Sequence, residues 1–385
     1  MKVALFTGNY NYVREGANQA LNRLVGFLEQ KCGHQVRVYS PTTATPAFEP
    51  SGTLVSVPSI ALPIRSEFRL ARGLPSSIRQ DVTAFEPDTF HVATPDVLGT
   101  RAVTMGRDLH IPVVASLHTL FETYLEHHRL GWLRAAVEAH LRRFYRRCDH
   151  VLAPTPALVA HVRRIRDDWG ATLWSRGVDR TLFYPGRRDL DWRRKLGIGD
   201  DEVIVLFLGR LVLEKGVEKY ASVLRGLKSR GAPVRPLIVG EGPARGVLQA
   251  LPGSIMTGHL DGTALARAVA SADILLHVSR TEAFGNVMLE AMASGLAVVA
   301  VESGAGSTMI VNGLNGVICG PGEADCAGAI LELIANPSER ERLGSAAAVA
   351  SEAYSWDAAS RSVAETYERL LRSRSRLVTR AGGSV

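Results

Sequence analysis

Two short apolar runs on either side of a helical segment constrain the fold of this chain more than any other feature. Residues 272–279 and 296–301 are each about as long as a buried parallel strand, and the residues between them are typical of a loop that leads into a helix. Strands joined in this way form open α/β sheets, which bind ligands at the carboxyl ends of their strands. The loop after residue 279 is therefore expected at a ligand-binding edge.

This loop and helix carry two carboxylates around a small turn, namely Glu282, then Phe284, Gly285 and Asn286, then Glu290. Peptide N–H groups at a helix start lack intrahelical partners, so the turn can bind hydroxyl or phosphate oxygens while Glu282 accepts from sugar hydroxyls. Glu290 follows about two turns later, so we expect both carboxylates to face one ligand from one helix face. An isolated pair of surface glutamates is usually only solvated. The flanking strands favour the ligand-binding interpretation.

The length of 385 residues allows two domains, each with its own core. No apolar run reaches about 18 residues, so no segment is predicted to span a bilayer, and the first residues indicate a buried strand rather than a signal peptide. A reducing cytoplasm suits four cysteines without metal-binding spacing, Cys32, Cys148, Cys319 and Cys326. Asp189 and Asp191 form a D-x-D pair without a preceding strand, which indicates an acidic helix N-terminus and not a metal site.

The formal net charge of +7 is unevenly distributed. Residues 1–175 carry an excess of +5 and residues 176–371 an excess of −2, while the last 14 residues add four arginines and no acid. The segment 130–147 is predicted to be an arginine-rich amphipathic helix whose apolar stripe packs inward and whose arginines can face lipid head groups. Basic excess indicates an anionic partner. No motif with interleaved aromatic residues indicates nucleic acid, so an anionic membrane surface is the expected partner.

The first half of the chain has the pattern of one Rossmann-like unit. Strands are expected at residues 2–6, 36–39, 90–93 and 113–117, with a helix at 17–30. Gly16, at the first strand-to-helix junction, allows the backbone to approach a ligand, although plain turn geometry explains such a glycine equally well. His118 follows the strand at 113–117, where Nδ1 or Nε2 can donate to a hydroxyl across a cleft; a lone histidine is as often structural.

The second half repeats the plan. The strand at 203–208 opens into a loop with Arg210 and Lys215 among glycines, and such cations offset the charge of a pyrophosphate when no metal is present. A helix at 356–371 is expected to cross back to the first domain. We therefore predict an acceptor-binding domain at 1–175 completed by 356–371, a donor-binding domain at 176–355, and a basic disordered tail at 372–385.

Together these features resemble the retaining GT-B glycosyltransferases, over nearly the whole chain. The resemblance rests on Arg210 with Lys215-Gly216, on the Glu282-x7-Glu290 pair, and on His118. Four further motifs resemble the branch of bacterial GDP-mannose-dependent α-mannosyltransferases and sulfoquinovosyl-diacylglycerol synthases: Ser116-Leu-His-Thr119, Leu130-Gly-Trp-Leu133, Leu141-Arg-Arg-Phe144 and Arg176-Gly-Val-Asp179. The fold implied is α/β with two Rossmann-like domains, an interdomain cleft and a C-terminal crossover helix.

The resemblance also implies roles for individual residues. Glu282 and the backbone of Phe284, Gly285 and Asn286 would hold the donor sugar, and Glu290 would bind the ribose hydroxyls. Arg210 and Lys215 would bind the diphosphate, His118 a sugar hydroxyl, and Gly16 would line the phosphate side of the cleft. The chain departs from the usual pattern at Ala17, where many members have a second glycine, and at 303–306, which replaces a Gly-Gly turn.

The implied activity is metal-independent transfer of a hexosyl unit, with GDP-mannose favoured, to a hydroxyl of a lipid-linked acceptor, and no cofactor is expected. Such an enzyme would work in the cytoplasm, peripherally at the inner face of the cytoplasmic membrane. Retention would follow a front-face route, in which the leaving diphosphate helps deprotonate the acceptor. Three alternatives stay open: a UDP-sugar-dependent glucuronosyl or glucosyl glycolipid synthase, a sugar-nucleotide 2-epimerase of the same architecture, and a binding protein without turnover.

Overall fold

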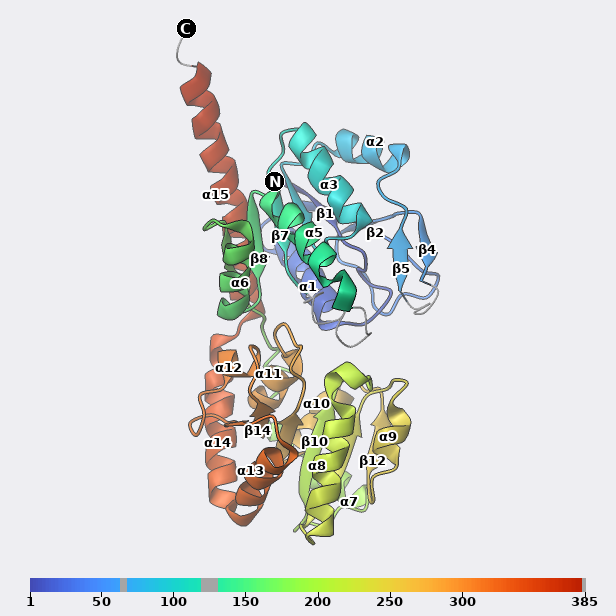
Figure 1. Ribbon diagram of the computed structural model, residues 1–385, viewed down its shortest axis with the longest axis vertical. Coiled ribbons are helices and arrows are strands. Elements are labelled where there is room, and N and C mark those ends of the chain that lie inside the picture. The colour runs from blue at the N-terminus through green and yellow to red at the C-terminus, as the bar shows by residue number, and fades with distance from the viewer. Residues whose placement is uncertain (63–67, 119–130, 383–385) are drawn as a thin grey trace. The chain divides into compact units, whose positions relative to one another are not determined.

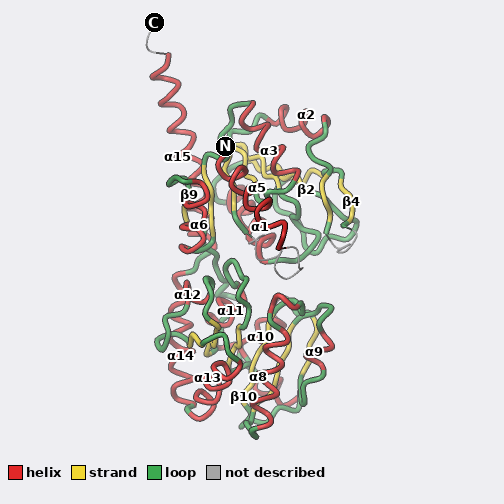
Figure 2. Tube along the Cα trace, viewed as in Figure 1, coloured by secondary structure: helices red, strands yellow, loops and turns green. Residues whose placement is uncertain are grey.

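The computed structural model describes residues 1–62, 68–118 and 131–382 of the chain. It divides into two compact units, Met1–Arg176 together with Trp356–Val385, and Gly177–Ser355 (Figure 1). Both units are α/β, with parallel strands and connecting helices (Figure 2). In the described residues, no helix is both long enough and apolar enough to cross a membrane.

The first unit is built on a seven-stranded parallel sheet with the order β3-β2-β1-β6-β7-β8-β9. Its strands are β1 (Lys2–Phe6), β2 (Gln35–Ser40), β3 (Thr53–Ser56), β6 (Thr89–Val92), β7 (Val113–Ser116), β8 (His150–Ala153) and β9 (Ala171–Leu173). Its described helices include α1 (Gly16–Gln30), α2 (Ser76–Phe85), α3 (Val97–Asp108), α5 (Arg134–Arg146) and α6 (Pro156–Arg166), beside a short antiparallel hairpin of β4 (Ser59–Ala61) and β5 (Arg69–Ala71). The strands predicted in this half are confirmed.

The second unit has a six-stranded parallel sheet with the order β12-β11-β10-β13-β14-β15. Its strands are β10 (Val203–Leu208), β11 (Val234–Val239), β12 (Ile255–Gly258), β13 (Ile274–His277), β14 (Ala297–Val301) and β15 (Val317–Cys319). Its described helices include α7 (Leu190–Lys195), α8 (Val217–Ser229), α9 (Arg245–Gln249), α10 (Gly262–Ala270), α11 (Asn286–Ala293), α12 (Gly306–Met309), α13 (Glu323–Ala335) and α14 (Pro337–Ala350). Strand order reverses between β10 and β13, where open α/β sheets bind ligands.

The C-terminal helix α15 (Trp356–Gly382) belongs to the first unit. Val363 and Tyr367 are fully buried in the core that also holds Leu21 and Leu24 of α1. The helix was predicted to end at residue 371 and instead extends to Gly382, whereas the disorder predicted for residues 372–385 stays a prediction. No proline or glycine interrupts the chain between Trp356 and Gly382, so the backbone continues as a helix.

The arginine-rich helix is shorter than predicted. Residue 130 lies outside the described part, Gly131–Leu133 form a 3-10 turn, and α5 follows. Leu141 and Phe144 of the predicted stripe are buried, but Trp132 is 78% exposed. Inward packing is therefore confirmed only for the last turns of the helix.

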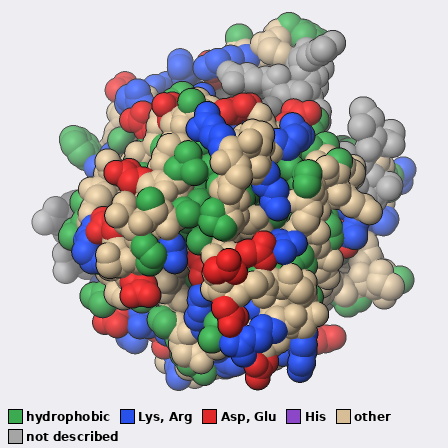
Figure 3. Space-filling model, turned by 90° about the horizontal axis from the view of Figure 1, so that it is seen from below, with side chains coloured by type: hydrophobic (Ala, Val, Ile, Leu, Met, Phe, Trp, Pro, Cys, Tyr) green, Lys and Arg blue, Asp and Glu red, His purple; other side chains and the backbone are tan. Residues whose placement is uncertain are grey.

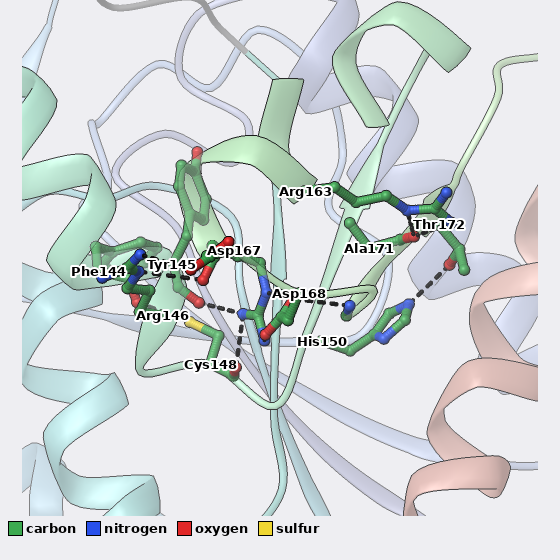
Figure 4. Close-up of polar contacts among 12 residues, drawn as sticks. Phe144, Tyr145, Arg146, Cys148, His150, Arg163, Asp167, Asp168, Ala171 and Thr172 are labelled. Carbon is green, nitrogen blue, oxygen red and sulfur yellow. Dashed lines mark hydrogen bonds and ion pairs between the residues drawn. The ribbon is translucent and has the colours of Figure 1, made fainter. Parts of the chain in front are cut away.

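A buried arginine joins the ends of α5 and α6, in the region drawn in Figure 4. Arg166 donates from Nε and Nη2 to the carboxylate of Asp168, at 2.8 Å each. Its Nη1 donates to the carbonyl of Cys148 at 2.8 Å and to that of Tyr145. Nearby, His150 Nε2 lies 2.8 Å from Thr172 Oγ1. These bonds fix the basic helices to the edge of the sheet.

In the second unit, α7 is attached to the sheet by a buried ion pair. The D-x-D segment caps this helix, since Asp189 accepts from the Trp192 N–H at 2.8 Å, and the interpretation as a helix N-terminus is confirmed. One turn on, Arg193 Nη1 lies 2.9 Å from Asp273 Oδ2, and the two side chains are only 2% and 8% exposed. Acidic and basic side chains lie interspersed on the face of the molecule shown in Figure 3.

Candidate active site

Two loops of the second unit meet at the carboxyl ends of β10 and β13. The β10 loop carries Arg210 and Lys215 and ends at Gly216, whose φ is 76°. A Cβ atom there would lie 2.8 Å from Val278 Cγ2, so only glycine allows this turn to pack against the end of β13. The hydroxyls of Ser279 and Thr281 donate to the carbonyl of Glu214 at 3.2 and 3.4 Å. The two loops are thereby held together.

The centre of this arrangement is an ion pair between Lys215 and Glu282. Lys215 Nζ lies 2.5 Å from Glu282 Oε1, with side-chain exposures of 29% and 15%. Burial would raise the pKa of the Glu282 carboxyl, but the ammonium of Lys215 and the nearby imidazole of His277 outweigh burial and hold this pKa well below its ordinary value. Glu282 is therefore an ionised acceptor, suited to hydroxyl groups.

Sequence reasoning assigned these two side chains to different parts of the donor, Lys215 to the diphosphate and Glu282 to the sugar. The structure brings them into direct contact. An ammonium has three N–H donors, so Lys215 can bind Glu282 and still donate to phosphate oxygens. The two assigned roles are compatible with the contact and stay predictions.

The turn after Glu282 is set by Gly285, whose φ is 89° and whose added Cβ would lie 2.4 Å from Met288 Cε. Phe284 is buried, with its ring 6.0 Å from that of Tyr354. Gly285, in its left-handed conformation, directly precedes α11, which begins at Asn286. Glu290 therefore lies on the helix, while Glu282 lies in the loop before it. The prediction that both carboxylates share one helix face is corrected accordingly.

Glycines also shape the loop around Arg210. The N–H of Gly209 donates to the Val239 carbonyl at 3.1 Å, and that of Leu211 to the Glu241 carbonyl at 2.8 Å. A Cβ on Gly240 would lie 1.9 Å from the Gly209 carbonyl oxygen. The backbone on both sides of Arg210 thus packs closely against the glycine-rich turn after β11. The predicted diphosphate contact of Arg210 stays a prediction.

The other predicted site residues belong to the first unit. Gly16 is exposed and forms the first residue of α1 in helical conformation. His118 follows β7 and is partly exposed, with its ring centroid 5.3 Å from that of the buried Trp174. The predicted cleft between the domains, to which both residues were assigned, stays a prediction.

His118 ends a hydrogen-bonded chain that sequence reasoning missed. Burial and the charge of Arg176 keep the pKa of His118 well below its ordinary value, so the ring is neutral. Arginine only donates, so Arg176 Nη2 donates to Nδ1 at 2.9 Å and the ring proton lies on Nε2, which donates to Ser116 Oγ at 2.8 Å. Ser116 Oγ also lies 2.8 Å from His91 Nε2, and His91 Nδ1 lies 2.5 Å from the Tyr367 hydroxyl.

Both ring nitrogens of His118 are thus used within the first unit, and neither is offered to a ligand in this arrangement. Its predicted contact with a donor sugar stays a prediction. Ser116 and Arg176 were noted only as parts of motifs, and Tyr367 lies 276 residues from His91. Nothing local in the sequence could have joined them.

The fully buried His91 gives a testable pH dependence. Burial lowers the pKa of His91 to about 3, whereas an unfolded histidine titrates near 6.5. The neutral ring therefore contributes stability that is complete above pH 6.5 and is lost as the pH falls from there towards 3. The loss is at most about 1.4 kcal/mol per pH unit.

We expect His91→Gln to flatten the fall in unfolding free energy between pH 7 and pH 5, measured by urea denaturation. His259→Gln, at an exposed position, is the control and should keep the wild-type slope. A His91→Gln slope equal to that of the wild type would contradict the assignment.

Comparison with known proteins decides the family. Residues 189–349 match the family described as Glycosyl transferases group 1, and residues 14–182 match Glycosyltransferase Family 4. A GDP-mannose-dependent alpha-mannosyltransferase of Mycolicibacterium smegmatis is 33% identical over 390 residues, covering 97% of this chain and 99% of that protein. The chain belongs to the group 1 glycosyltransferases.

Other group 1 glycosyltransferases show the range of named activities. A sulfoquinovosyl transferase of Arabidopsis thaliana is 30% identical over 88% of this chain and 68% of its own length. An alpha-monoglucosyldiacylglycerol synthase of Streptococcus pneumoniae is 27% identical over 89% and 80%. The resemblance to the mannosyltransferase and sulfoquinovosyl branch is confirmed, and the protein is a transferase.

The fold of this group 1 glycosyltransferase also matches solved structures. Sucrose-phosphate synthase from Thermosynechococcus elongatus superposes with a TM-score of 0.79 at 20% identity, covering 97% of this chain and 99% of that one. At this identity the likeness concerns the fold alone. It confirms the predicted GT-B class with two Rossmann-like units. No group of three or more His, Cys, Asp or Glu side chains suited to a metal ion occurs among the described residues.

Proposed function

We propose that the protein is a retaining mannosyltransferase that uses GDP-mannose and a lipid-linked acceptor, without a metal ion. The observation that carries the proposal is the Lys215–Glu282 pair at the switch point between β10 and β13. It presents an ionised carboxylate for sugar hydroxyls next to an ammonium for phosphate. Mannose and GDP are favoured because the mannosyltransferase of Mycolicibacterium smegmatis matches over nearly its whole length.

In the proposed reaction the acceptor oxygen forms a bond to the anomeric carbon as the bond from that carbon to the diphosphate oxygen breaks. The acceptor proton passes to the leaving diphosphate on the same face of the sugar, so the configuration is retained. Lys215 and Arg210 would stabilise the charge that develops on the diphosphate, and Glu282 would hold the sugar in position. Glu290 would bind the ribose.

A lipid acceptor is supported by two observations. The Streptococcus pneumoniae relative is named an alpha-monoglucosyldiacylglycerol synthase. The first unit carries the basic excess, with arginines on α5 and α6, and Trp132 and Trp169 are 78% and 82% exposed. Exposed indole rings beside arginines suit the interface of an anionic membrane. The proposed location is peripheral, at the inner face of the cytoplasmic membrane.

The test is transfer from a set of donors to vesicles of phosphatidylglycerol containing diacylglycerol. We expect GDP release from GDP-mannose that depends on the vesicles, and a mannolipid with the α-configuration by NMR. Activity only with UDP-glucose or UDP-glucuronic acid would replace the mannosyl proposal with the glycolipid synthase that the Streptococcus pneumoniae relative makes the second candidate. Donor consumption without any acceptor would indicate an epimerase, and a β-linked product would refute retention.

A further inference from the structure

One buried side chain at the candidate active site has no explanation in packing. His277 is the last residue of β13 and is 5% exposed. Within the described residues, neither of its ring nitrogens has a hydrogen-bond partner, and both are inaccessible to solvent. Buried polar groups are nearly always hydrogen-bonded, and an apolar ring would fill this position without leaving two nitrogens unpaired. The imidazole must therefore be required for another reason.

The position of the ring suggests that reason. His277 Nε2 lies 3.6 Å from Glu282 Oε1, just beyond hydrogen-bond distance. Oε1 is also the atom that binds Lys215 Nζ at 2.5 Å. Glu282 Oε1 thus has one bonded donor, Lys215 Nζ, and a second nitrogen nearby, His277 Nε2, that lies too far away for a hydrogen bond. Because the ionised carboxylate only accepts, an interaction with His277 needs a proton on Nε2.

A bound diphosphate would change the balance between these two donors. Lys215 has N–H donors for both groups, but the negative charge of the phosphate oxygens would attract its ammonium, and its short contact to Oε1 would lengthen. Glu282 would then be a largely buried carboxylate with a weakened partner, which is costly. A shift of roughly 0.7 Å would bring His277 Nε2 to a normal hydrogen-bond distance of about 2.9 Å.

We propose that His277 is a positioning residue that replaces Lys215 as the donor to Glu282 Oε1 when a nucleoside diphosphate sugar binds. His277 then keeps Glu282 ionised and oriented, so that Oε2 faces the sugar hydroxyls while Lys215 serves the diphosphate. The inference rests on the proposed function. It adds a residue that neither the E-x7-E pair nor the cationic loop contains.

The test compares two ligands, GDP and GDP-mannose, by isothermal titration calorimetry. Both ligands carry the diphosphate that attracts Lys215, but only GDP-mannose also requires Glu282 to be oriented toward sugar hydroxyls. A role through Glu282 therefore affects GDP-mannose more than GDP. We expect His277→Phe to weaken GDP-mannose binding about 10-fold, the effect of one hydrogen bond to a charged group, and to weaken GDP binding much less. His277→Gln, which retains a side-chain N–H donor, should restore part of the loss.

A double-mutant comparison separates positioning from a general effect on packing. In the background of Glu282→Gln the carboxylate is absent, so adding His277→Phe should cause no further loss. Equal weakening of GDP and GDP-mannose, wild-type binding by His277→Phe, or losses that add fully in the double variant would each overturn the inference alone. If the wild type binds none of GDP-mannose, UDP-glucose and UDP-glucuronic acid, the proposed function fails and the inference with it.

Discussion

Lys215→Met is expected to lower kcat for sugar transfer by a factor of about 10² to 10³, with a much smaller effect on donor affinity. The ammonium would stabilise charge that develops on the leaving diphosphate, so its loss acts on the transition state more than on the bound donor. The substitution also removes the bonded partner of Glu282 Oε1. Stopped assays of GDP release at saturating GDP-mannose measure the effect.

The same variant is expected to be less stable at neutral pH. The depressed pKa of Glu282 means that its ion pair contributes stability above the unfolded pKa near 4.5, and that this contribution is lost as the pH falls through the folded value. In Lys215→Met the ion pair is absent, so its contribution to the unfolding free energy is missing at pH 7 as well. Adding Glu282→Gln should restore stability, because the buried charge is removed, but it should not restore turnover.

Arg225→Met provides a matched control, because Arg225 is exposed further along α8, the helix that follows Lys215. It removes one positive charge from the same unit and should leave kcat and the melting temperature near those of the wild type. Unchanged turnover in Lys215→Met would refute the assigned role of this lysine.

Asp273→Asn is expected to reduce the unfolding free energy by about 3–5 kcal/mol. Asp273 accepts from Arg193 Nη1 at 2.9 and 3.1 Å, from Arg188 Nη2 at 2.5 Å, and from the Ile204 N–H at 2.7 Å. Its replacement leaves the guanidinium of Arg193, 2% exposed, as a buried charge without its carboxylate. The cost arises from that unpaired charge more than from the lost bonds.

Urea unfolding of the wild type and of Asp273→Asn measures this difference in unfolding free energy. Glu339→Gln is the control variant. Glu339 pairs with Arg342 at 2.6 Å, but both side chains are more than 40% exposed, so little change is expected. A value for Asp273→Asn within about 0.5 kcal/mol of the wild type would show that α7 is attached to the sheet by other contacts.

The alternation of apolar runs and helical segments was sufficient to predict two α/β units, because parallel strands buried on both faces appear in the sequence as continuous apolar runs. The contact between Lys215 and Glu282 could not be derived, since 67 residues separate the two and only the strand order brings them together. The start of α11 depends on the backbone conformation of Gly285, which the residue type permits but does not dictate. His277 and the chain from Arg176 to Tyr367 depend on tertiary packing alone.

Binding of GDP-mannose by the purified protein tests the central claim most directly, namely that the second unit holds a nucleoside diphosphate sugar at the Lys215–Glu282 pair. A ligand that binds only the native state raises the melting temperature, by the equivalent of about 2.7 kcal/mol at a concentration 100 times Kd. We predict that GDP and GDP-mannose raise the melting temperature of the wild type, and that Glu282→Gln retains the response to GDP while losing part of that to GDP-mannose. No response of the wild type to any GDP, UDP or ADP sugar would contradict the claim.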